Sequence, residues 1–485
     1  MAKHLLAARE EHRDQLALAG KNPYPTWNER RNLASEITLR FQKLERKSVT
    51  VAGRVGVLRT HGGVCFLDLR DASGQIQLLF KKDVLGDALF SLLDTTDPGD
   101  ILAVHGTVVR TTAGEISVEA KTWTLLSKAL ASPPEKRSGL QNNEERSRRR
   151  EVDLLANEET RQVFTVRSRV LEILRNFLTT NGFTEVETPI LQHLAGGAAA
   201  LPFRTHHHAL NLDLSLRVAP ELYLKRLVIG GYEKVFELGR VFRNEGIDRQ
   251  HNPEFTICEL YQAYATVEDL IPLAERLISD LLTEIQGSPR IPYQRQTLNF
   301  LAPWPRVSFV EAVEKATGVN VLTERDADAY LKALKRLRVE PPEDQTLPNL
   351  MDELMTEAVR KKTAGPLLIS GAPTELEPLA KRDPNEPRLV QRIQLVAAGM
   401  ELMKAYTEEN DPVEQELRFR EQSKLRGQTE IHPFDTEYLE ALKVGLPPTA
   451  GWGMGVDRLV MLAANQPSIR DVLFFPLLRP KAKGA

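Results

Sequence analysis

The sequence predicts an α+β protein in which a small antiparallel barrel precedes a larger domain of mixed helices and strands. Short alternating apolar runs separated by turn residues fill 50–126, as in small barrels. From about residue 160, helical periodicity alternates with strand-like runs that come from distant parts of the chain. The length of 485 residues suits roughly three domain-sized units.

The composition is that of an ordinary globular protein, with 42% hydrophobic and 27% charged residues. The net charge of −2 neither indicates nor excludes a polyanionic partner, because local patches decide such binding. Cys65 and Cys258 are far apart, which predicts a reducing compartment without a disulfide framework. The N-terminal segment lacks the apolar core of a signal peptide, and no run approaches the ~18 apolar residues of a membrane span. We therefore expect a cytoplasmic protein with no membrane partner.

Residues 1–48 are expected to form a helical extension, with one helix over about 3–19, ended by Gly20, and another patch at about 33–46. The barrel is expected at 49–128, where five strand-like runs are interrupted by a helical stretch near 85–95. Five strands with a helix before the fourth are typical of an oligonucleotide-binding (OB) barrel. On pattern alone, another small antiparallel barrel fits equally well.

A charged, proline-containing linker is expected at 129–158. Its basic cluster could contact phosphate, although a solvated linker helix is the simpler interpretation. The cluster consists of Arg146, Arg148, Arg149 and Arg150. The second domain is expected at 159–485, with a mainly helical insertion at about 265–365 to which the sequence assigns no chemistry.

The stretch "VFRNEGIDRQHNPEF", residues 241–255, carries more charge than a hairpin turn requires. Strand alternation places Phe255, Glu259 and Tyr261 on one face, near Arg243 at the end of the preceding strand. Arginine suits a bidentate grip on phosphate, an aromatic ring suits stacking, and a carboxylate suits an ammonium. The hairpin thus indicates a nucleotide and a cationic small molecule, or else a charged hairpin exposed to solvent.

The end of the chain favours the first interpretation. "GLPPTAGWGMGVDRLVML", residues 445–462, has glycines at 451, 453 and 455, a spacing that differs from the dinucleotide-binding fingerprint. Alternate glycines leave one face of a strand bare, so that a planar ligand can approach the backbone. Arg458 then falls in the first turn of the next helix, where it can meet a nucleotide triphosphate.

These motifs resemble those of class II aminoacyl-tRNA synthetases, specifically the bacterial lysine type, over nearly the whole chain. "GFTEVETPIL" (182–191) is similar to the first motif, whose Pro189 lies at the family's dimer interface. "FRNEG…HNPEF" and "GMGVDR" resemble the second and third motifs, and 196–231 resembles the lysine-type active-site segment. The resemblance implies an OB-fold barrel for the anticodon and an antiparallel sheet flanked by helices for catalysis.

The implied reaction condenses L-lysine with ATP to lysyl-adenylate and then transfers the lysyl group to tRNA(Lys), in a homodimer with Mg²⁺ as cofactor. Catalysis of this kind rests on positioning and on charge stabilisation at the α-phosphate. By resemblance, the catalytic residues are Arg243 and Arg458. The ATP-binding residues would be Arg243, Glu245, His251, Asn252, Phe255, Glu401 and Arg458. The lysine-binding residues would be Gly197, Glu221, Glu259, Tyr261, Tyr406 and Glu408.

In the barrel, Phe66, Gln77 and Glu115 match the positions that read the central anticodon base. Taken singly, they fit a core phenylalanine and two surface polar residues equally well. The run from His206 to His208 could suggest a metal, but the family has histidines here without using them as ligands, so we expect a structural role.

Four positions depart from the family pattern. Gln394 replaces the glutamate that, with Glu401, would hold Mg²⁺, and Leu201 replaces an arginine. Lys404 replaces an asparagine near the expected lysine substrate, and a second ammonium ~4 Å away would cost ~4 kcal/mol unless Glu408 or Glu377 neutralises it. Glu377, where serine is usual, makes a charge swap possible. The alternatives are a divergent paralogue with another amino-acid substrate, or a tRNA-binding or regulatory protein. An enzyme that lysylates a protein is a weaker alternative, because that type usually lacks the barrel.

Overall fold

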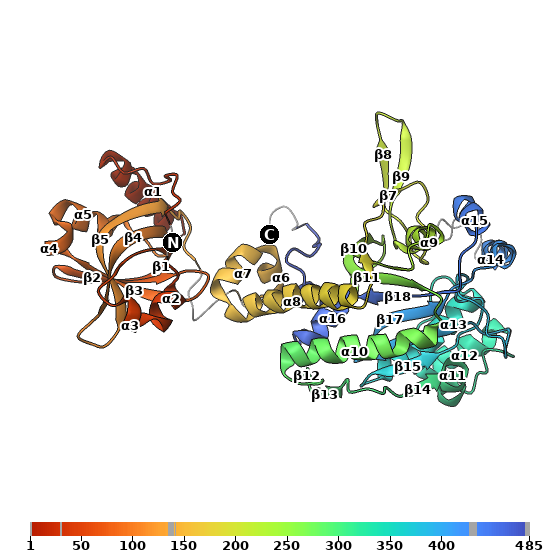
Figure 1. Cartoon of the computed structure of the whole chain (residues 1–485). Helices are drawn as coiled ribbons and strands as arrows, with labels where there is room; N and C mark the ends of the chain where they lie inside the picture. Colours follow the sequence, from red (N-terminus) through yellow and green to blue (C-terminus); the bar gives the residue numbers. More distant parts are fainter. Residues whose placement is uncertain (1, 30–31, 134–139, 141, 426–433, 481–485) are drawn as a thin grey trace. The chain divides into compact units, whose positions relative to one another are not determined.

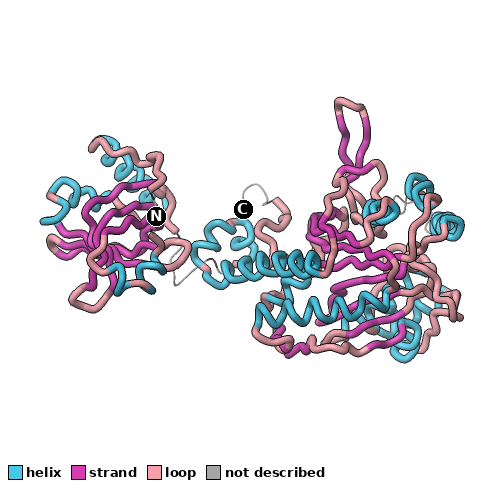
Figure 2. The backbone as a smooth tube through the Cα atoms, in the orientation of Figure 1, coloured by secondary structure: helices cyan, strands magenta, loops and turns pink. Residues whose placement is uncertain are grey.

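The computed structural model describes residues 2–29, 32–133, 140, 142–425 and 434–480. The chain divides into two compact units (Figure 1, Figure 2). The N-terminal unit comprises Met1–Gln141 and Glu151–Ala156, and the C-terminal unit comprises Asn142–Arg150 and Asn157–Ala485. Positions 134–139 and 141 of the expected linker lie outside the described residues.

The N-terminal unit is a closed five-stranded barrel with strand order β1-β2-β3-β5-β4. Its helices are α1 (Ala2–Leu18), α2 (Ala34–Leu39), α3 (Phe41–Leu44), α4 (Lys82–Leu85), α5 (Asp87–Ser91) and the 3-10 helix η1 (Leu92–Thr95). Its strands are β1 (Ser48–His61), β2 (Val64–Arg70), β3 (Gln75–Lys81), β4 (Ile101–Arg110) and β5 (Ile116–Ser127). Closure leaves no free sheet edge. The predicted barrel, with its helical turn before the fourth strand, is confirmed.

The C-terminal unit begins with α6 (Asn143–Arg148). Helix α7 (Arg150–Ala156) belongs to the N-terminal unit except for its first residue, and the C-terminal unit resumes with α8 (Glu158–Thr180). Its other helices are α9 (Glu221–Ile229), α10 (Val267–Gln286), α11 (Phe309–Thr317), α12 (Ala327–Leu337), α13 (Leu347–Ala358), η2 (Arg360–Lys362), α14 (Pro412–Leu425), α15 (Thr436–Leu442), α16 (Val456–Ala463) and η3 (Ile469–Asp471). Its strands are β6 (Thr184–Glu185), β7 (Leu191–Gln192), β8 (Arg204–His207), β9 (Leu212–Leu216), β10 (Lys234–Phe242), β11 (Glu254–Ala263), β12 (Arg290–Tyr293), β13 (Gln296–Asn299), β14 (Arg306–Ser308), β15 (Leu367–Ser370), β16 (Arg392–Ala397), β17 (Met400–Thr407) and β18 (Thr449–Gly455).

Eight of these strands form one sheet, in the order β14-β15-β16-β17-β18-β11-β10-β6. The neighbours from β15 to β10 are antiparallel, whereas β14 pairs parallel with β15 and β6 parallel with β10. The expected antiparallel sheet is therefore mixed at its two edges. Strands from distant parts of the chain are neighbours in it, as the sequence predicts.

The two faces of the sheet differ in chemistry because side chains alternate along each strand. On β11, Cys258 and Leu260 join the main hydrophobic core with residues of α8, α10 and α16. The neighbouring positions Glu259 and Tyr261 face the opposite side. Helix α13 packs with α11 and α12 in a separate core cluster that also includes Ile369 of β15. The sheet thus has one face sealed by helices and one that carries polar side chains.

The expected helical insertion at 265–365 contains α10 to α13 but also three short strands, β12, β13 and β14. Three or four residues are too few to show the alternation that identifies a strand, so the sequence pattern missed them. The basic cluster also differs from a fully solvated helix. Arg150 is buried, and its guanidinium donates to the backbone carbonyls of Phe474 and Arg470 at 3.1 and 3.3 Å.

Candidate functional site

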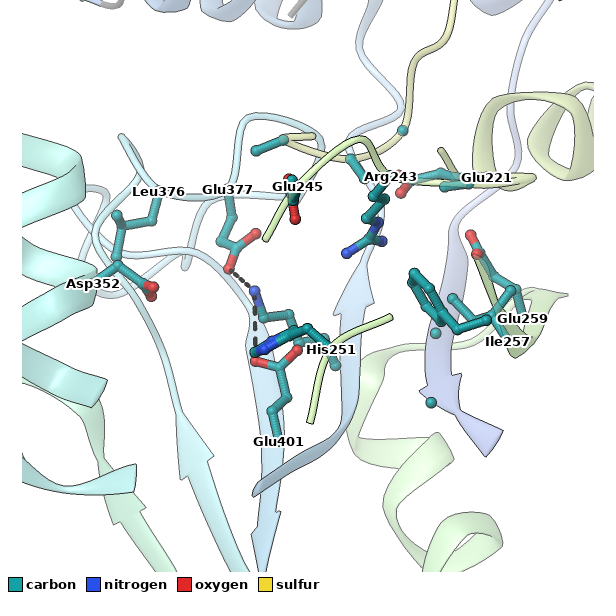
Figure 3. Close-up of a pocket in the computed structure, with 18 of the residues that line it drawn as sticks. Glu221, Arg243, Glu245, His251, Ile257, Glu259, Asp352, Leu376, Glu377 and Glu401 are labelled. Atoms are coloured by element: carbon teal, nitrogen blue, oxygen red, sulfur yellow. Dashed lines mark ion pairs between the residues drawn. The ribbon is translucent and has the colours of Figure 1, made fainter. Parts of the chain in front are cut away.

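A cavity of about 950 Å³ lies on the polar face of the sheet, within the size range of small-molecule sites. Figure 3 shows Glu221 and Glu259 on one side of it, Asp352, Glu377 and Glu401 on the other, and Arg243 between them (Figure 3). The predicted residues that line the cavity are Gly197, Glu221, Arg243, Glu245, His251, Asn252, Phe255, Glu259, Tyr261, Glu401, Tyr406 and Arg458. Glu408, Gln394 and Leu201 are not part of the lining.

Arg243 follows β10 at the base of the hairpin, where its amide donates to the carbonyl of Pro253 at 2.8 Å. Its guanidinium lies 5.1 Å from the ring centre of Phe255 and makes no ion pair with any described residue. Burial lowers the pKa of Arg243, and the positive charge of Arg458 adds to this effect, although nearby carboxylates oppose it. A half-buried guanidinium without a carboxylate partner favours an anionic ligand.

Two glycines of β18 leave room for side chains of the neighbouring strands, and one of them, Gly453, lines the cavity. A Cβ on Gly451 would lie 2.3 Å from Cε1 of Tyr261, so the tyrosine can cross this strand only where a side chain is missing. Gly453 separates Glu259 of β11 from Lys404 of β17 in the sheet register. At Gly451 the bare strand face is occupied by Tyr261 of the protein itself, so the approach of a planar ligand to these glycines stays a prediction.

Arg458 lies in the first turn of α16 and enters the same cavity as Arg243. Its Nη1 donates to the carbonyl of Glu401 at 2.7 Å, and its Nη2 lies 2.9 Å from Nε2 of His251. Nδ1 of that histidine is 2.8 Å from a carboxylate oxygen of Asp248. The structure therefore brings together the two arginines that the sequence placed in widely separated motifs.

Asn252 ends the loop of the hairpin and is buried. Its amide nitrogen donates to the carbonyl of Glu254 at 2.7 Å, which fixes the side chain. Its Oδ1 has no hydrogen-bond partner among the described residues. Because a buried oxygen without a partner is costly, it is suited to accept from a ligand hydroxyl.

The other side of the cavity is acidic and buried. Glu259 is 3% exposed and accepts a hydrogen bond of 2.8 Å from the hydroxyl of Tyr261. Burial and the negative charge of Glu221 raise the pKa of Glu259 to about 8. Gly197, at a φ of +88°, packs against this group, and a Cβ there would lie 2.9 Å from Cβ of Glu221.

Lys225, which the sequence analysis missed, lies within this acidic group with its side chain fully buried. Its Nζ is 2.6 Å from Glu221 and also pairs with Glu408, which explains why Glu408 lies behind the cavity wall. Burial also raises the pKa of Glu408 to about 8. With Glu259, the group contains three buried carboxyl groups and one ammonium. A second cation would stabilise the ionised form of the carboxyl groups whose pKa is raised, so the group favours a cationic ligand. Lys225 lies four residues after Glu221 on α9, and this i,i+4 spacing is the sequence signal that could have identified it.

The departures Lys404 and Glu377 meet as a charge pair. Nζ of Lys404 lies 3.7 Å from Oε1 of Glu377 and 3.7 Å from Oε2 of Glu401. Dashed lines mark these two ion pairs in Figure 3, where Glu377 and Glu401 are labelled. Glu377 also pairs with the buried Arg392 at 3.2 Å and accepts from the Tyr406 hydroxyl at 2.8 Å. Of the two carboxylates that could neutralise Lys404, the structure selects Glu377.

The predicted Mg²⁺ ligands do not fit a divalent cation as they are folded. The Gln394 amide nitrogen donates to Oε2 of Glu401, and the Gln394 oxygen accepts from Arg360 at 3.2 Å. Although burial opposes it, the positive charges of Lys404, Arg360 and Arg458 hold the pKa of Glu401 at about 2. Within the described part of the chain, no three His, Cys, Asp or Glu side chains gather closely enough to hold a metal. This includes the histidines at 206–208, of which His206 pairs with Asp213.

Several further lining residues come from the insertion to which the sequence assigned no chemistry, and two of them are paired charges. Asp352 of α13 and Arg360 of η2 form an ion pair beside Glu401. Nothing in the local sequence distinguishes them, because charged residues on a helix usually face solvent.

In the barrel, Phe66 and Gln77 lie on the outer face of adjacent strands, whereas Cys65 and Leu67 point into the core. Gln77 accepts a hydrogen bond of 2.8 Å from the Ser117 hydroxyl, two residues after the exposed Glu115. The interpretation of Phe66 as a core residue is therefore wrong, and none of the three predicted side chains belongs to the buried core of the barrel.

The segment at Pro189 is exposed and is followed by three exposed apolar side chains. These are Ile190, Leu191 and Leu194, with exposed fractions of 44%, 49% and 43%. Leu201 is 40% exposed and holds the hairpin loop through its backbone, since its carbonyl accepts from the amide of Asn244 at 2.7 Å. In the described part of the chain, no helix has the length and apolarity needed to cross a membrane.

Comparisons with known proteins agree with this geometry. Residues 142–479 match the family model described as tRNA synthetases class II (D, K and N), and residues 49–126 match the OB-fold nucleic acid binding domain. A lysine–tRNA ligase of Syntrophomonas wolfei is 43% identical over 484 residues, covering 99% of this chain and 98% of that protein. A lysine–tRNA ligase of Staphylococcus aureus strain MW2 is 41% identical over 487 residues, covering 98% of both.

Proposed function

The chain belongs to the class II tRNA synthetases of the D, K and N group, and we propose that it is a lysine–tRNA ligase. It joins L-lysine to ATP as lysyl-adenylate and then esterifies tRNA(Lys). One observation carries the proposal: a single cavity holds two guanidinium groups that form no ion pair with any described carboxylate, and a group of buried carboxyl side chains at one end. A nucleotide polyphosphate fits the first, and a cationic amino acid fits the second.

In the first step, a lysine carboxylate oxygen attacks the α-phosphorus of ATP. The bond from that phosphorus to the β-phosphate oxygen breaks, and diphosphate leaves. Arg243 lies between the two sides of the cavity, so we assign it to the α-phosphate and the substrate carboxylate. Holding both reactants converts the encounter into an intramolecular step, and its charge stabilises the developing phosphorane oxygens.

The remaining nucleotide contacts follow from the hairpin and α16. Phe255 stacks on adenine, and Glu245 accepts from the adenine amino group. Arg458 covers the other face of the base and reaches the γ-phosphate, while His251 and Asn252 contact the distal phosphates and ribose. The orphan Oδ1 of Asn252 supports a contact with a ribose hydroxyl. The substrate is ATP with its own Mg²⁺.

On the acidic side, Glu221, Glu259 and Tyr261 bind the ammonium groups of lysine, with Gly197 beside them. Glu408 contributes through Lys225, because its carboxylate pairs with that ammonium behind the cavity wall. Tyr406 borders the cavity, where Glu377 orients its hydroxyl. In the second step, a 3′-terminal ribose hydroxyl of tRNA attacks the lysyl carbonyl carbon, and AMP leaves.

We further propose a division of labour along the chain. Residues 1–48 form an N-terminal extension, and residues 49–128 bind the anticodon through Phe66, Gln77 and Glu115. Residues 129–158 link the two domains, and residues 159–485 form the catalytic domain. The two family matches, at 49–126 and 142–479, support this division. The exposed apolar side chains after Pro189 support a homodimer, since such a patch favours association. The proposed location is the cytoplasm.

The decisive experiment is ATP–diphosphate exchange with each amino acid, followed by charging of tRNA(Lys). We expect exchange with lysine above all others, and lysyl-tRNA as product. Exchange with another amino acid would indicate the divergent paralogue, and tRNA binding without exchange would indicate a regulatory protein. The pairing of Lys404 with Glu377 supports the charge swap that leaves lysine activation intact.

A further inference from the structure

A β-bulge brings an unusual set of charges to the nucleotide side of the cavity. Strand alternation would put Glu401 and Lys404 on opposite faces of β17. The register shifts, however, so that Val396 pairs with Glu401 and Leu395 pairs with Met403. The extra residue turns Glu401 onto the face of Lys404 and of its cross-strand neighbour Gln394.

One carboxylate oxygen of Glu401 and the side-chain oxygen of Gln394 are already engaged by groups of the protein. Oε2 of Glu401 accepts from the Gln394 amide and lies 3.7 Å from the Lys404 ammonium. The side-chain oxygen of Gln394, which could otherwise bind a hard cation, accepts from Arg360. A divalent cation that bound Oε2 of Glu401 would have to displace both the amide and the ammonium.

The ion pairs of the cavity wall also oppose a divalent cation held by the protein. Three carboxylates of the cavity wall lie around Lys404 and Arg360, namely Asp352, Glu377 and Glu401, and each forms an ion pair. The cations around them are Arg360, Arg392, Lys404 and Arg458. Each of these three carboxylates is thus paired with a cation of the protein before any ligand enters. A divalent cation would have to compete with these cations for the same carboxylates.

Building on the proposed function, we propose that the Lys404 ammonium takes the place of a protein-held divalent cation beside Glu401. The loaded site then contains the divalent cation that ATP carries and none bound by the protein itself. An ammonium is a compact point charge that binds phosphate, so it can supply the same neutralisation without the octahedral ligand set that Mg²⁺ demands. Lys404 is therefore a phosphate-binding residue of this chain.

The proposal is tested by counting Mn²⁺ with electron paramagnetic resonance. Mn²⁺ is titrated into the full-length enzyme with lysine and a β,γ-methylene analogue of ATP, and bound nucleotide is counted in parallel. We expect about one Mn²⁺ per bound nucleotide in the unmodified enzyme. The double variant Lys404→Asn with Gln394→Glu frees Glu401 and adds a carboxylate, so a second Mn²⁺ should bind ~10-fold or more tightly than in the unmodified enzyme.

The matched control is Lys443→Asn, which removes an exposed ammonium paired with Glu440 and should leave the count unchanged. Two or more Mn²⁺ per bound nucleotide in the unmodified enzyme would overturn the inference, whether or not the double variant folds. An equal Mn²⁺ count in a folded double variant that binds the nucleotide would overturn it as well. An enzyme that binds no nucleotide analogue refutes the proposed function itself, and the parallel nucleotide count separates this failure from the other two.

Discussion

Replacing Glu259 by glutamine tests the acidic side of the cavity most directly. The substitution keeps the size of the side chain and a carbonyl oxygen for the Tyr261 hydroxyl, which donates to Glu259 at 2.8 Å. It removes the charge that a lysine ammonium would meet. Because Glu259 is 3% exposed, solvent screens that charge poorly.

The magnitude follows from two opposing contributions. Opposite unit charges about 4 Å apart attract by about 4 kcal/mol at an effective dielectric constant near 20. The pKa of Glu259 is about 8, so ionising it at pH 7 costs about one pKa unit, or about 1 kcal/mol. The difference is about 3 kcal/mol, which corresponds to a roughly 100-fold loss of lysine affinity in the variant.

The assay is lysine-dependent ATP–diphosphate exchange, with the KM for lysine measured between pH 6 and pH 8.5. The control is Glu254→Gln, the same change at an exposed position of the same strand, where the carboxylate lies 3.7 Å from Arg240. We expect this control to keep the KM of the unmodified enzyme. The KM for ATP should change little in either variant, because neither residue is assigned to the nucleotide.

The raised pKa of Glu259 determines how lysine binding should depend on pH. Below pH 8 the free enzyme holds a proton on Glu259, and binding of an ammonium must release it. Lysine affinity should therefore fall by up to about tenfold for each pH unit below 8, while the Glu259→Gln variant shows a flatter profile. A folded variant whose KM for lysine equals that of the unmodified enzyme would refute this account of the acidic side.

Three further predictions concern nucleotide binding, the glycines of β18 and the barrel. Arg458→Lys keeps the charge but loses the planar fork, so kcat/KM for ATP in the exchange assay should fall ~100-fold, and an unchanged value would contradict its assignment. Gly451→Ala puts a Cβ 2.3 Å from Tyr261 and should cost ~1–3 kcal/mol in urea unfolding, whereas Gly453→Ala, with its nearest neighbour at 3.4 Å, should cost less. Phe66→Ala should weaken tRNA(Lys) binding by ~1–3 kcal/mol in a filter assay while lysine-dependent exchange persists, and equal tRNA affinity would remove the residue from the anticodon site.

The sequence by itself determined the elements whose signals are local. Alternation within single strands predicted the barrel and put Phe255, Glu259 and Tyr261 on one face, because a period of two is set by adjacent residues. The two arginine motifs also pointed to one nucleotide before any contact between them was visible. Their shared cavity agrees with that expectation.

Tertiary structure alone decided which charges meet. Lys225 and Glu408 are distant in the chain, so nothing in the sequence shows that they pair behind the cavity wall. The orientation of the Gln394 amide depends on Arg360, which comes from an insertion with the pattern of an ordinary helical segment. A charged residue on a helix has the same sequence pattern whether it faces solvent or a ligand. Only the packing of distant segments brings it to water or to a carboxylate, and this sets its charge partner and its pKa.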